Sequence, residues 1–264
     1  MSDTHVRPHA RCIVRVVSMR RAGQHAVMHW VADNSPGTYL MLNDVHVNVS
    51  PFRTPRGRHR FGSNHRLIRW APALLGRLWP KQLLIYNHED ACLPEFCSYG
   101  IDATRAQSRY SLLVLRDAFN LFASRLAGLR HYSEHGRVAD IYKAMWRLHA
   151  GEYSGRTRYL DDLVPVSFNR WATDAGYQAS LAGRLGLVLR SRGTRLTRQG
   201  GGSSFDSAGE FDPQNLCSRF VSQLDNPVFR QAFAGEQELL ETNLELFGDS
   251  LWAHRDRLQR LVQG

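Results

Sequence analysis

The residues best suited to chemistry lie in a short basic loop, residues 18–23, with the sequence SMRRAG. A β-branched run at 13–17 precedes the loop, and apolar residues at helical spacing follow it (Ala26, Val27, Trp30 and Val31). The pattern predicts a strand, a loop and a helix. Backbone N–H groups at a helix N-terminus lack partners within the helix and favour an anion. Arg20 and Arg21 add positive charge and Gly23 permits close backbone approach, so the loop is a candidate cradle for phosphate or sulfate.

This loop differs from the Walker A motif of nucleotide-binding proteins. That motif needs Gly-x-x-x-x-Gly-Lys followed by Ser or Thr. Here Gly23 is the one glycine of the loop, arginine takes the place of the cation, and no hydroxyl follows to hold Mg²⁺. An ordinary turn between a strand and a helix, with two surface arginines, is the alternative explanation.

Ionisable side chains also follow two further apolar runs. The run at 82–87, QLLIYN, leads into His88-Glu89-Asp90, and the run at 111–115, SLLVL, leads into Arg116. Open α/β sheets bind ligands at the carboxyl ends of their strands, so these positions suit chemistry. Helical spacing after Arg116 places Ser124 about two turns into a helix, where both side chains can converge on one anion. A polar strand-end turn and an exposed serine are the alternatives.

The remaining pattern completes an α/β protein. Strands are predicted at 38–42 and 163–169, and Pro165 makes the second an edge strand or irregular. Helices are predicted at 136–160, at 174–187 and, with one apolar face, within 235–264. This alternation predicts an α/β protein, and the length of 264 residues fits one large domain or two small ones.

Composition and charge restrict the class of partner. The chain has a formal net charge of +10 and 43% hydrophobic residues, which implies a core and an anionic partner such as a nucleotide, nucleic acid, acidic glycan or membrane surface. Its four cysteines have no metal-site spacing and are expected to be reduced thiols. The polar first residues and the lack of any run near the roughly 18 apolar residues of a membrane span predict a soluble, cytoplasmic protein.

Two basic segments interrupt the predicted elements. Residues 51–81 contain eight Lys or Arg and no Asp or Glu, and we interpret them as a mobile lid over an anionic substrate or a patch for peripheral membrane contact; a solvated loop is the alternative. Residues 190–210 are rich in glycine. Within them, backbone N–H groups and hydroxyls could close over a phosphate, although a flexible surface loop explains them equally (Gly201, Gly202, Ser203 and Ser204).

Taken together, residues 12–210 resemble the sulfotransferases that use 3′-phosphoadenosine 5′-phosphosulfate (PAPS). The stretch SMRRAGQHAVMHW is similar to the family's loop for the 5′-phosphosulfate. LVLRDAFNLFASRLA is similar to its 3′-phosphate motif, with Arg116 and Ser124 at the family's spacing. VSFNRW and LAGRLGL resemble a later strand and helix, and QGGGSSFD resembles the Gly-rich loop over the 3′-phosphate.

The resemblance implies a single sulfotransferase domain, 1–264, with a three-layer α/β fold: a mostly parallel central sheet flanked by helices, with P-loop-like nucleotide binding. It also implies PAPS as co-substrate, no metal, and two groups of binding residues. The 5′-phosphosulfate would lie against the first loop and helix (Arg20, Arg21, Ala22, Gly23, Gln24 and His25). The 3′-phosphate would lie against Arg116, Ser124 and the residues Gly201, Gly202, Ser203 and Ser204. The family's common Lys-Ser-Gly-Thr-Thr is here Arg-Ala-Gly-Gln-His, so Gln24, His25 and backbone N–H groups would replace the missing hydroxyls at the 5′-phosphate.

The resemblance also implies an in-line transfer of the sulfuryl group to a hydroxyl. The acceptor would be a glycan, a lipid-linked sugar or a small metabolite, including anionic or membrane-associated ones. Arg21 would meet the charge that develops on the bridging oxygen. The family's base is a His or Glu at a strand end, and both His88 and Glu89 occur here. Neighbours on an extended strand face opposite sides, and we expect Glu89 to face the substrate; His88 is the alternative, because an unperturbed histidine titrates near neutrality.

Two other functions compete with this interpretation. A small-molecule kinase of the P-loop type needs a metal-holding hydroxyl after the cation, and that hydroxyl is missing. A nucleic-acid-binding protein could use the basic segment 51–81. It would leave the ordered set Arg21, Arg116, Ser124 and Gly202 without a role, so no nucleic-acid partner is expected.

Overall fold

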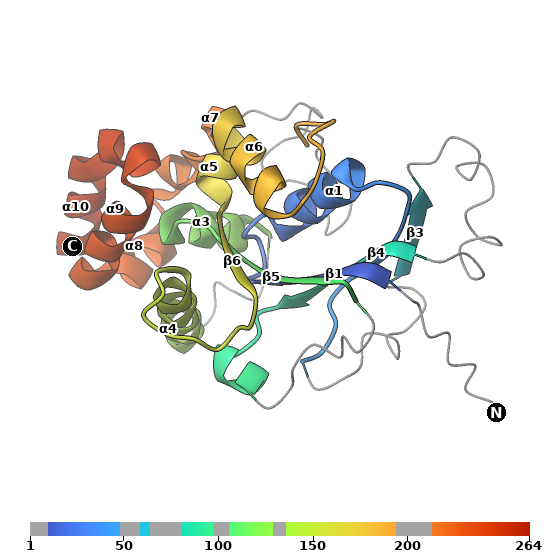
Figure 1. Cartoon of the computed structure of the whole chain (residues 1–264). Helices are drawn as coiled ribbons and strands as arrows, with labels where there is room; N and C mark the ends of the chain where they lie inside the picture. Colours follow the sequence, from blue (N-terminus) through green and yellow to red (C-terminus); the bar gives the residue numbers. More distant parts are fainter. Residues whose placement is uncertain (1–9, 48–58, 64–80, 98–105, 129–135, 194–212) are drawn as a thin grey trace.

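The computed structural model describes residues 10–47, 59–63, 81–97, 106–128, 136–193 and 213–264. Its six strands form one sheet in the order β3-β2-β4-β1-β5-β6 (Figure 1). The strands from β2 to β6 in this order run parallel, and β3 pairs antiparallel with β2 at one edge. Their bounds are β1 (Ala10–Ser18), β2 (Thr38–Leu42), β3 (His59–Ser63), β4 (Lys81–Glu89), β5 (Ser108–Leu115) and β6 (Leu163–Ser167).

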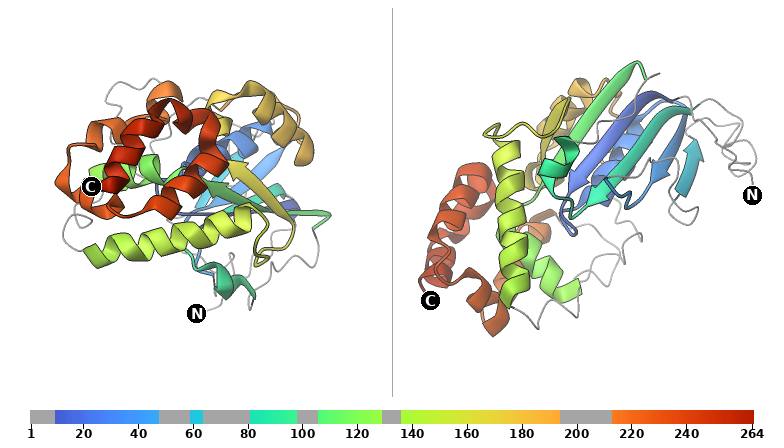
Figure 2. Two further views of the ribbon diagram at one scale, coloured as in Figure 1. Left: turned by 90° about the vertical axis from the view of Figure 1, so that its left-hand side faces the viewer. Right: turned by 90° about the horizontal axis from the view of Figure 1, so that it is seen from below.

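Helices cover both faces of the sheet and gather at one end of it (Figures 1 and 2). Helices α1 (Gln24–Asn34) and α6 (Ala175–Arg184) pack on one face, and η3 (Leu93–Cys97) packs on the other. A group of helices packs together beyond the sheet: α3 (Ala118–Gly128), α4 (Gly136–Tyr153), η6 (Arg219–Gln223), α8 (Pro227–Phe233), α9 (Gln237–Leu251), η7 (Trp252–His254) and α10 (Arg255–Gln263). Two short helices complete the structure, α5 (Phe168–Thr173) and α7 (Pro213–Leu216).

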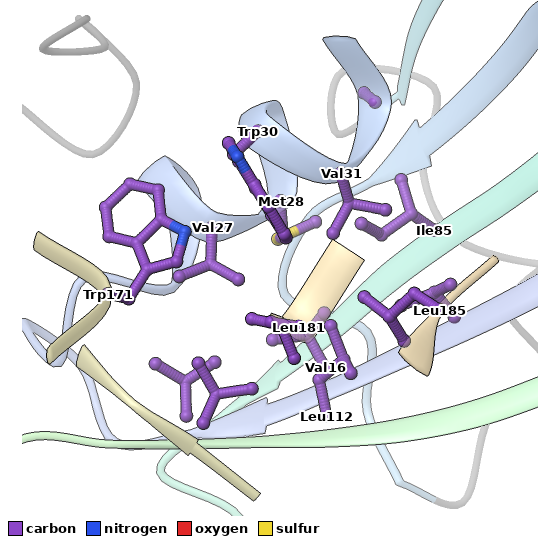
Figure 3. Close-up of a cluster of buried hydrophobic side chains, with 14 of the residues drawn as sticks. Val16, Val27, Met28, Trp30, Val31, Ile85, Leu112, Trp171, Leu181 and Leu185 are labelled. Carbon is purple, nitrogen blue, oxygen red and sulfur yellow. The ribbon is translucent and has the colours of Figure 1, made fainter. Parts of the chain in front are cut away.

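The sheet is buried on both faces because its central strands are almost continuously apolar. Val14 and Val16 of β1 face the cluster beneath α1 and α6, whereas Val17 faces the cluster beneath η3. Figure 3 shows the first cluster, in which Trp30 and Trp171 meet edge to face with ring centroids 6.3 Å apart. Apolar cover on both sides is the normal condition for parallel strands. It leaves the strand ends and the loops that follow them as the place for polar chemistry.

The structure confirms several sequence predictions and corrects others. The predicted strand 38–42 is β2, and β6, which contains Pro165, is an edge strand as expected. Residues 59–63 form a strand within a segment predicted to be loop. The strand pairs antiparallel with β2, and its sequence HRFGS lacks the apolar alternation from which a strand is predicted. The predicted helix 136–160 ends at Tyr153, where Gly155 turns the chain with a φ of 77°.

Two further predictions concern the ends of segments. The predicted strand 163–169 stops at Ser167, whose hydroxyl accepts the N–H of Arg170 and so begins α5. The predicted C-terminal helix 235–264 is divided into α9, η7 and α10.

The rest of the predicted lid, 51–58 and 64–80, lies outside the described residues. Across the ranges that the structure describes, no helix combines the length and hydrophobicity needed to cross a membrane.

We predict that Gly23→Ala destabilises the protein. Gly23 caps α1 with a φ of 93°, and a Cβ atom there would lie 2.1 Å from the Phe168 ring. The loss in the free energy of unfolding should exceed about 1 kcal/mol, measured by urea denaturation. Gly183→Ala is the matched control: it lies within α6 with open space around it, and the same change there should stabilise by about 0.5–1 kcal/mol. Equal midpoints for Gly23→Ala and the parent would contradict this loop conformation.

Candidate functional site

The loop between β1 and α1 has the conformation of an anion cradle. Its backbone turns back on itself, with the Ala22 N–H donating to the Met19 carbonyl over 3.1 Å. Arg21 and Gly23 both adopt positive φ, at 73° and 93°. Positive φ is uncommon for arginine, so neighbouring groups must hold the loop in this shape. The first N–H groups of α1 then point out of the helix end toward any bound anion.

A buried ion pair holds this loop in place. The Arg20 N–H donates to Asp90 Oδ1 over 2.9 Å, and Arg125 Nη1 donates to the Arg20 carbonyl over 3.1 Å. Arg125 also donates to both Asp90 carboxylate oxygens, at 2.9 and 3.2 Å. The Arg125 side chain is fully buried, and its guanidinium carbon lies 3.6 Å from the centre of the Tyr142 ring. The backbone on both sides of Arg20 is therefore fixed, immediately before Arg21.

The predicted 3′-phosphate residues lie beside this loop. Arg21 Nε donates to the Ser124 carbonyl over 3.3 Å, and Arg116 Nη1 donates to the Arg21 carbonyl over 3.3 Å. Arg116 and Ser124 are both buried. Burial lowers the pKa of Arg116 to about 10, and the nearby Arg219 and Arg21 act in the same direction. The positive charges of Arg21, Arg116 and Arg219 therefore lie close together, at the predicted phosphate-binding residues.

A polar network connects this half of the site to the C-terminal helices. The buried Asp117 carboxylate accepts the N–H of Asn120 over 2.8 Å and an amide N–H of Asn169 over 2.8 Å. Asn120 donates in turn to the Cys217 carbonyl and accepts the Phe220 N–H. Arg116 Nη2 donates to the carbonyl of Leu216, and so helps to anchor the segment that begins at α7.

Glu89 lies against the loop. It is the last residue of β4 and pairs with Ser18, the last residue of β1. Its Oε2 accepts from Arg20 Nε over 2.9 Å, and its Oε1 accepts from Gln24 Nε2 over 2.9 Å and Asn87 Nδ2 over 3.2 Å. Its side chain is 9% exposed. The side chains of Arg20 and Gln24, predicted at the 5′-phosphosulfate, thus contact this carboxylate.

His88 points to the opposite face of the sheet, as strand alternation requires. Its Nδ1 lies 2.5 Å from the Val45 carbonyl, and its ring packs between Tyr86 and Phe96. The residue is 4% exposed, and this burial lowers its pKa to about 4. His88 is therefore a neutral core histidine, separated by the sheet from the contacts of Glu89.

The loop after β2 supplies further polar groups near Glu89. His25 Nε2 lies 2.6 Å from Asn43 Oδ1 and 3.4 Å from Glu89 Oε1. Asp44 Oδ2 lies 3.6 Å from Arg20 Nη2. The Asp44 N–H donates to the side-chain oxygen of Asn87, which also holds Glu89. The strand ends of β2 and β4 therefore form one hydrogen-bonded group with the first turn of α1.

Sequence reasoning gave no role to Arg125, Asn43, Asp44, Asn87 or Arg219. Arg125 and Asp90 each neighbour a predicted site residue, Ser124 and Glu89. This adjacency indicates their ion pair only when the strand order is known. The predicted residues Gly201, Gly202, Ser203 and Ser204 lie outside the described residues. Within the described ranges, no group of His, Cys, Asp or Glu side chains has an arrangement that could hold a metal ion.

The architecture has a counterpart among solved structures. The sulfotransferase domain of the Synechococcus PCC 7002 olefin synthase superposes with a TM-score of 0.52, over 91% of this chain and 96% of that chain. This chain has the fold of a sulfotransferase domain. The sequence identity is 14%, no protein-family model matches the sequence, and no curated protein matches it. The sulfotransferase fold confirms the predicted α/β class, with five parallel strands flanked by helices.

We predict that the burial of His88 makes the protein sensitive to acid. Its pKa of about 4 in the fold lies below the 6.5 of an unfolded histidine. Between these values the unfolded state binds more protons, so stability falls as the pH drops through this window. The contribution of His88 should approach about 3 kcal/mol by pH 4.

The measurement is urea unfolding of the parent and of His88→Asn from pH 7 to 4.5. Asparagine keeps a donor for the Val45 carbonyl and cannot titrate, so the variant should lose less stability on acidification. His46→Asn, at an exposed histidine, is the control and should follow the parent. Parallel curves for the parent and His88→Asn would disprove the buried neutral state.

Proposed function

We propose that this protein transfers the sulfuryl group of PAPS to a hydroxyl group of an acceptor. The observation that carries the proposal is the convergence of Arg21, Arg116 and Ser124 at the N-terminus of α1. These are the residues at which the sequence resembles the PAPS-binding motifs, and they lie together within a sulfotransferase fold.

The two anionic ends of PAPS would be bound by different chemistry. We assign the 3′-phosphate to the Arg116 guanidinium and the Ser124 hydroxyl, with Gly201–Ser204 as further candidates by resemblance. For the 5′-phosphosulfate we assign the backbone N–H groups of Gly23, Gln24 and His25, together with the side chain of Arg21; the Ala22 N–H donates to the Met19 carbonyl instead. The side chains of Arg20 and Gln24 are bound to Glu89, so their assigned contribution is to hold that carboxylate.

The proposed reaction is an in-line displacement at sulfur. The acceptor oxygen forms a bond to sulfur while the bond from sulfur to the bridging oxygen breaks, and the electron pair stays on the bridging oxygen. Arg21 neutralises that developing charge; its planar guanidinium can contact the bridging and sulfuryl oxygens together. The proton of the acceptor hydroxyl passes to the Glu89 side of the β4 end, because His88 lies on the other face of the sheet.

Chromatography on immobilised adenosine 3′,5′-bisphosphate tests the nucleotide assignment. We expect retention that free adenosine 3′,5′-bisphosphate reverses and ATP does not, together with no retention on immobilised DNA. Elution by ATP would favour a kinase, and retention on DNA would favour a nucleic-acid-binding protein. Transfer of label from [³⁵S]PAPS to pooled hydroxylated metabolites and glycans then identifies the acceptor class.

We predict that Arg116→Ala weakens adenosine 3′,5′-bisphosphate binding by about 10- to 100-fold in calorimetry. The reason is the loss of a charge-assisted contact of about 1.5–3 kcal/mol. At saturating PAPS the variant should retain most of its kcat. Arg109→Ala, at an exposed arginine on β5, is the control. Because Arg116 also holds the Leu216 carbonyl, Ser124→Ala is a second, milder variant that should weaken binding several-fold. Parental affinity in both variants would remove the 3′-phosphate assignment.

We predict that Glu89→Gln lowers kcat by about 10²- to 10⁴-fold, because the acceptor proton then lacks its anionic partner. Binding of adenosine 3′,5′-bisphosphate should change little. His88→Asn should leave kcat close to the parental value, since its ring contacts Val45, Tyr86 and Phe96. The reverse pattern, with His88→Asn severe and Glu89→Gln mild, would place the base on the other face of the sheet.

A further inference from the structure

We infer that His25 is the group that takes the acceptor proton directly, with Glu89 and Asn43 as the residues that position it. This inference rests on the proposed function and refines it. His25 is the second residue of α1, next to the loop that would hold the sulfuryl group. The resemblance assigned it to the 5′-phosphate, in a position where the family has a threonine.

The surroundings of Glu89 suit an orienting carboxylate better than a base that collects a proton. Both of its oxygens already accept hydrogen bonds from N–H donors: Arg20 at Oε2, and Gln24 and Asn87 at Oε1. A guanidinium has no acceptor atom, so it cannot reverse its bond if the carboxylate becomes protonated. Protonation of Glu89 would therefore break contacts that hold the loop, whereas an ionised Glu89 keeps them.

The ring of His25 is held by one nitrogen. Nε2 lies between two oxygens, Asn43 Oδ1 at 2.6 Å and Glu89 Oε1 at 3.4 Å. An ionised carboxylate accepts hydrogen bonds and cannot donate them, so the ring hydrogen belongs on Nε2. Nδ1 then keeps its lone pair, and the contacts of the ring with described residues all run through Nε2. The side chain of His25 is 17% exposed, whereas His88 is 4% exposed and His149 is completely buried.

This geometry provides a base for the acceptor proton during the transfer. The O–H bond of the acceptor breaks and its proton goes to His25 Nδ1, while the oxygen forms its bond to sulfur. The bond to the bridging oxygen breaks, and Arg21 meets the charge that remains there. The imidazolium that forms lies beside the Glu89 carboxylate, which stabilises it as the acidic residue of a hydrolase triad stabilises its histidine.

The decisive variant is His25→Ala. We expect kcat with [³⁵S]PAPS, measured with the acceptor fraction that the parent labels, to fall by about 10²- to 10⁴-fold. The affinity for adenosine 3′,5′-bisphosphate should stay within about twofold of the parent, and added imidazole should restore part of the activity. If the affinity instead falls tenfold or more while kcat at saturating PAPS stays parental, His25 is a phosphate ligand and the inference fails.

Glu89→Gln separates the positioning role from the base. Its kcat should be reduced, and imidazole should not rescue it because the His25 ring is still present. If Glu89 were itself the base, His25→Ala would retain near-parental kcat, and that result would overturn the inference. A parent that neither binds adenosine 3′,5′-bisphosphate nor transfers label would instead refute the proposed function.

The tautomer can be measured without any variant. Long-range ¹H–¹⁵N correlation spectra of the parent, with the His25 signals assigned through His25→Ala or His25→Gln, should show the hydrogen of this ring on Nε2. A hydrogen on Nδ1 would contradict the inference, because Nδ1 could not then accept a proton.

Discussion

The ion pair between Asp90 and Arg125 is the interaction on which the rest of the site depends. It fixes the N–H and the carbonyl of Arg20, and the next residue adopts a positive φ that arginine seldom takes. Removing one partner of such a pair leaves an uncompensated buried charge, which typically costs about 3–5 kcal/mol. Because Arg125 follows Ser124 directly, the turn of α3 that holds the loop also carries a residue that we propose for the 3′-phosphate.

The end of β4 shows how strand alternation separates two neighbouring ionisable groups. Glu89 faces the loop and is surrounded by donors, whereas His88 faces an aromatic cluster and is kept neutral by burial. Glu89 and His88 are both ionisable and adjacent in sequence, but they have different environments because they lie on opposite faces of the sheet. The buried Asn87 accepts the Asp44 N–H and donates to the Glu89 side chain, so hydrogen bonds join the loop after β2 to the end of β4.

Local patterns were sufficient to predict the strand–loop–helix unit and most of the parallel strands, whereas the convergence of Arg116 and Ser124 on one phosphate stays a prediction. Each of these elements depends on residues close in sequence, where periodicity and chain geometry leave few alternatives. The β3 strand, the Asp90–Arg125 pair and the approach of His25 to Asn43 were not predictable in this way. They depend on which strands are neighbours, and the order β3-β2-β4-β1-β5-β6 is a property of the whole chain. Arg219 lies close enough to Arg116 to lower its pKa. The segment around Arg219 is held there by hydrogen bonds of Arg116 and Asn120.

The hydrogen bond from Arg116 to the Leu216 carbonyl has a consequence for the architecture of the chain. In Figure 1, helices α8, α9 and α10 lie beyond the end of the sheet and look like a separate part of the protein. Yet two buried donors, Arg116 and Asn120, use carbonyls of this segment as partners. A chain shortened before Leu216 would lack these two carbonyls, and among the described residues the side chains of Arg116 and Asn120 would donate only to the Arg21 carbonyl and the Asp117 carboxylate. For protein engineering, the C-terminal helices therefore belong within the minimal folding unit, and a fusion boundary belongs after them.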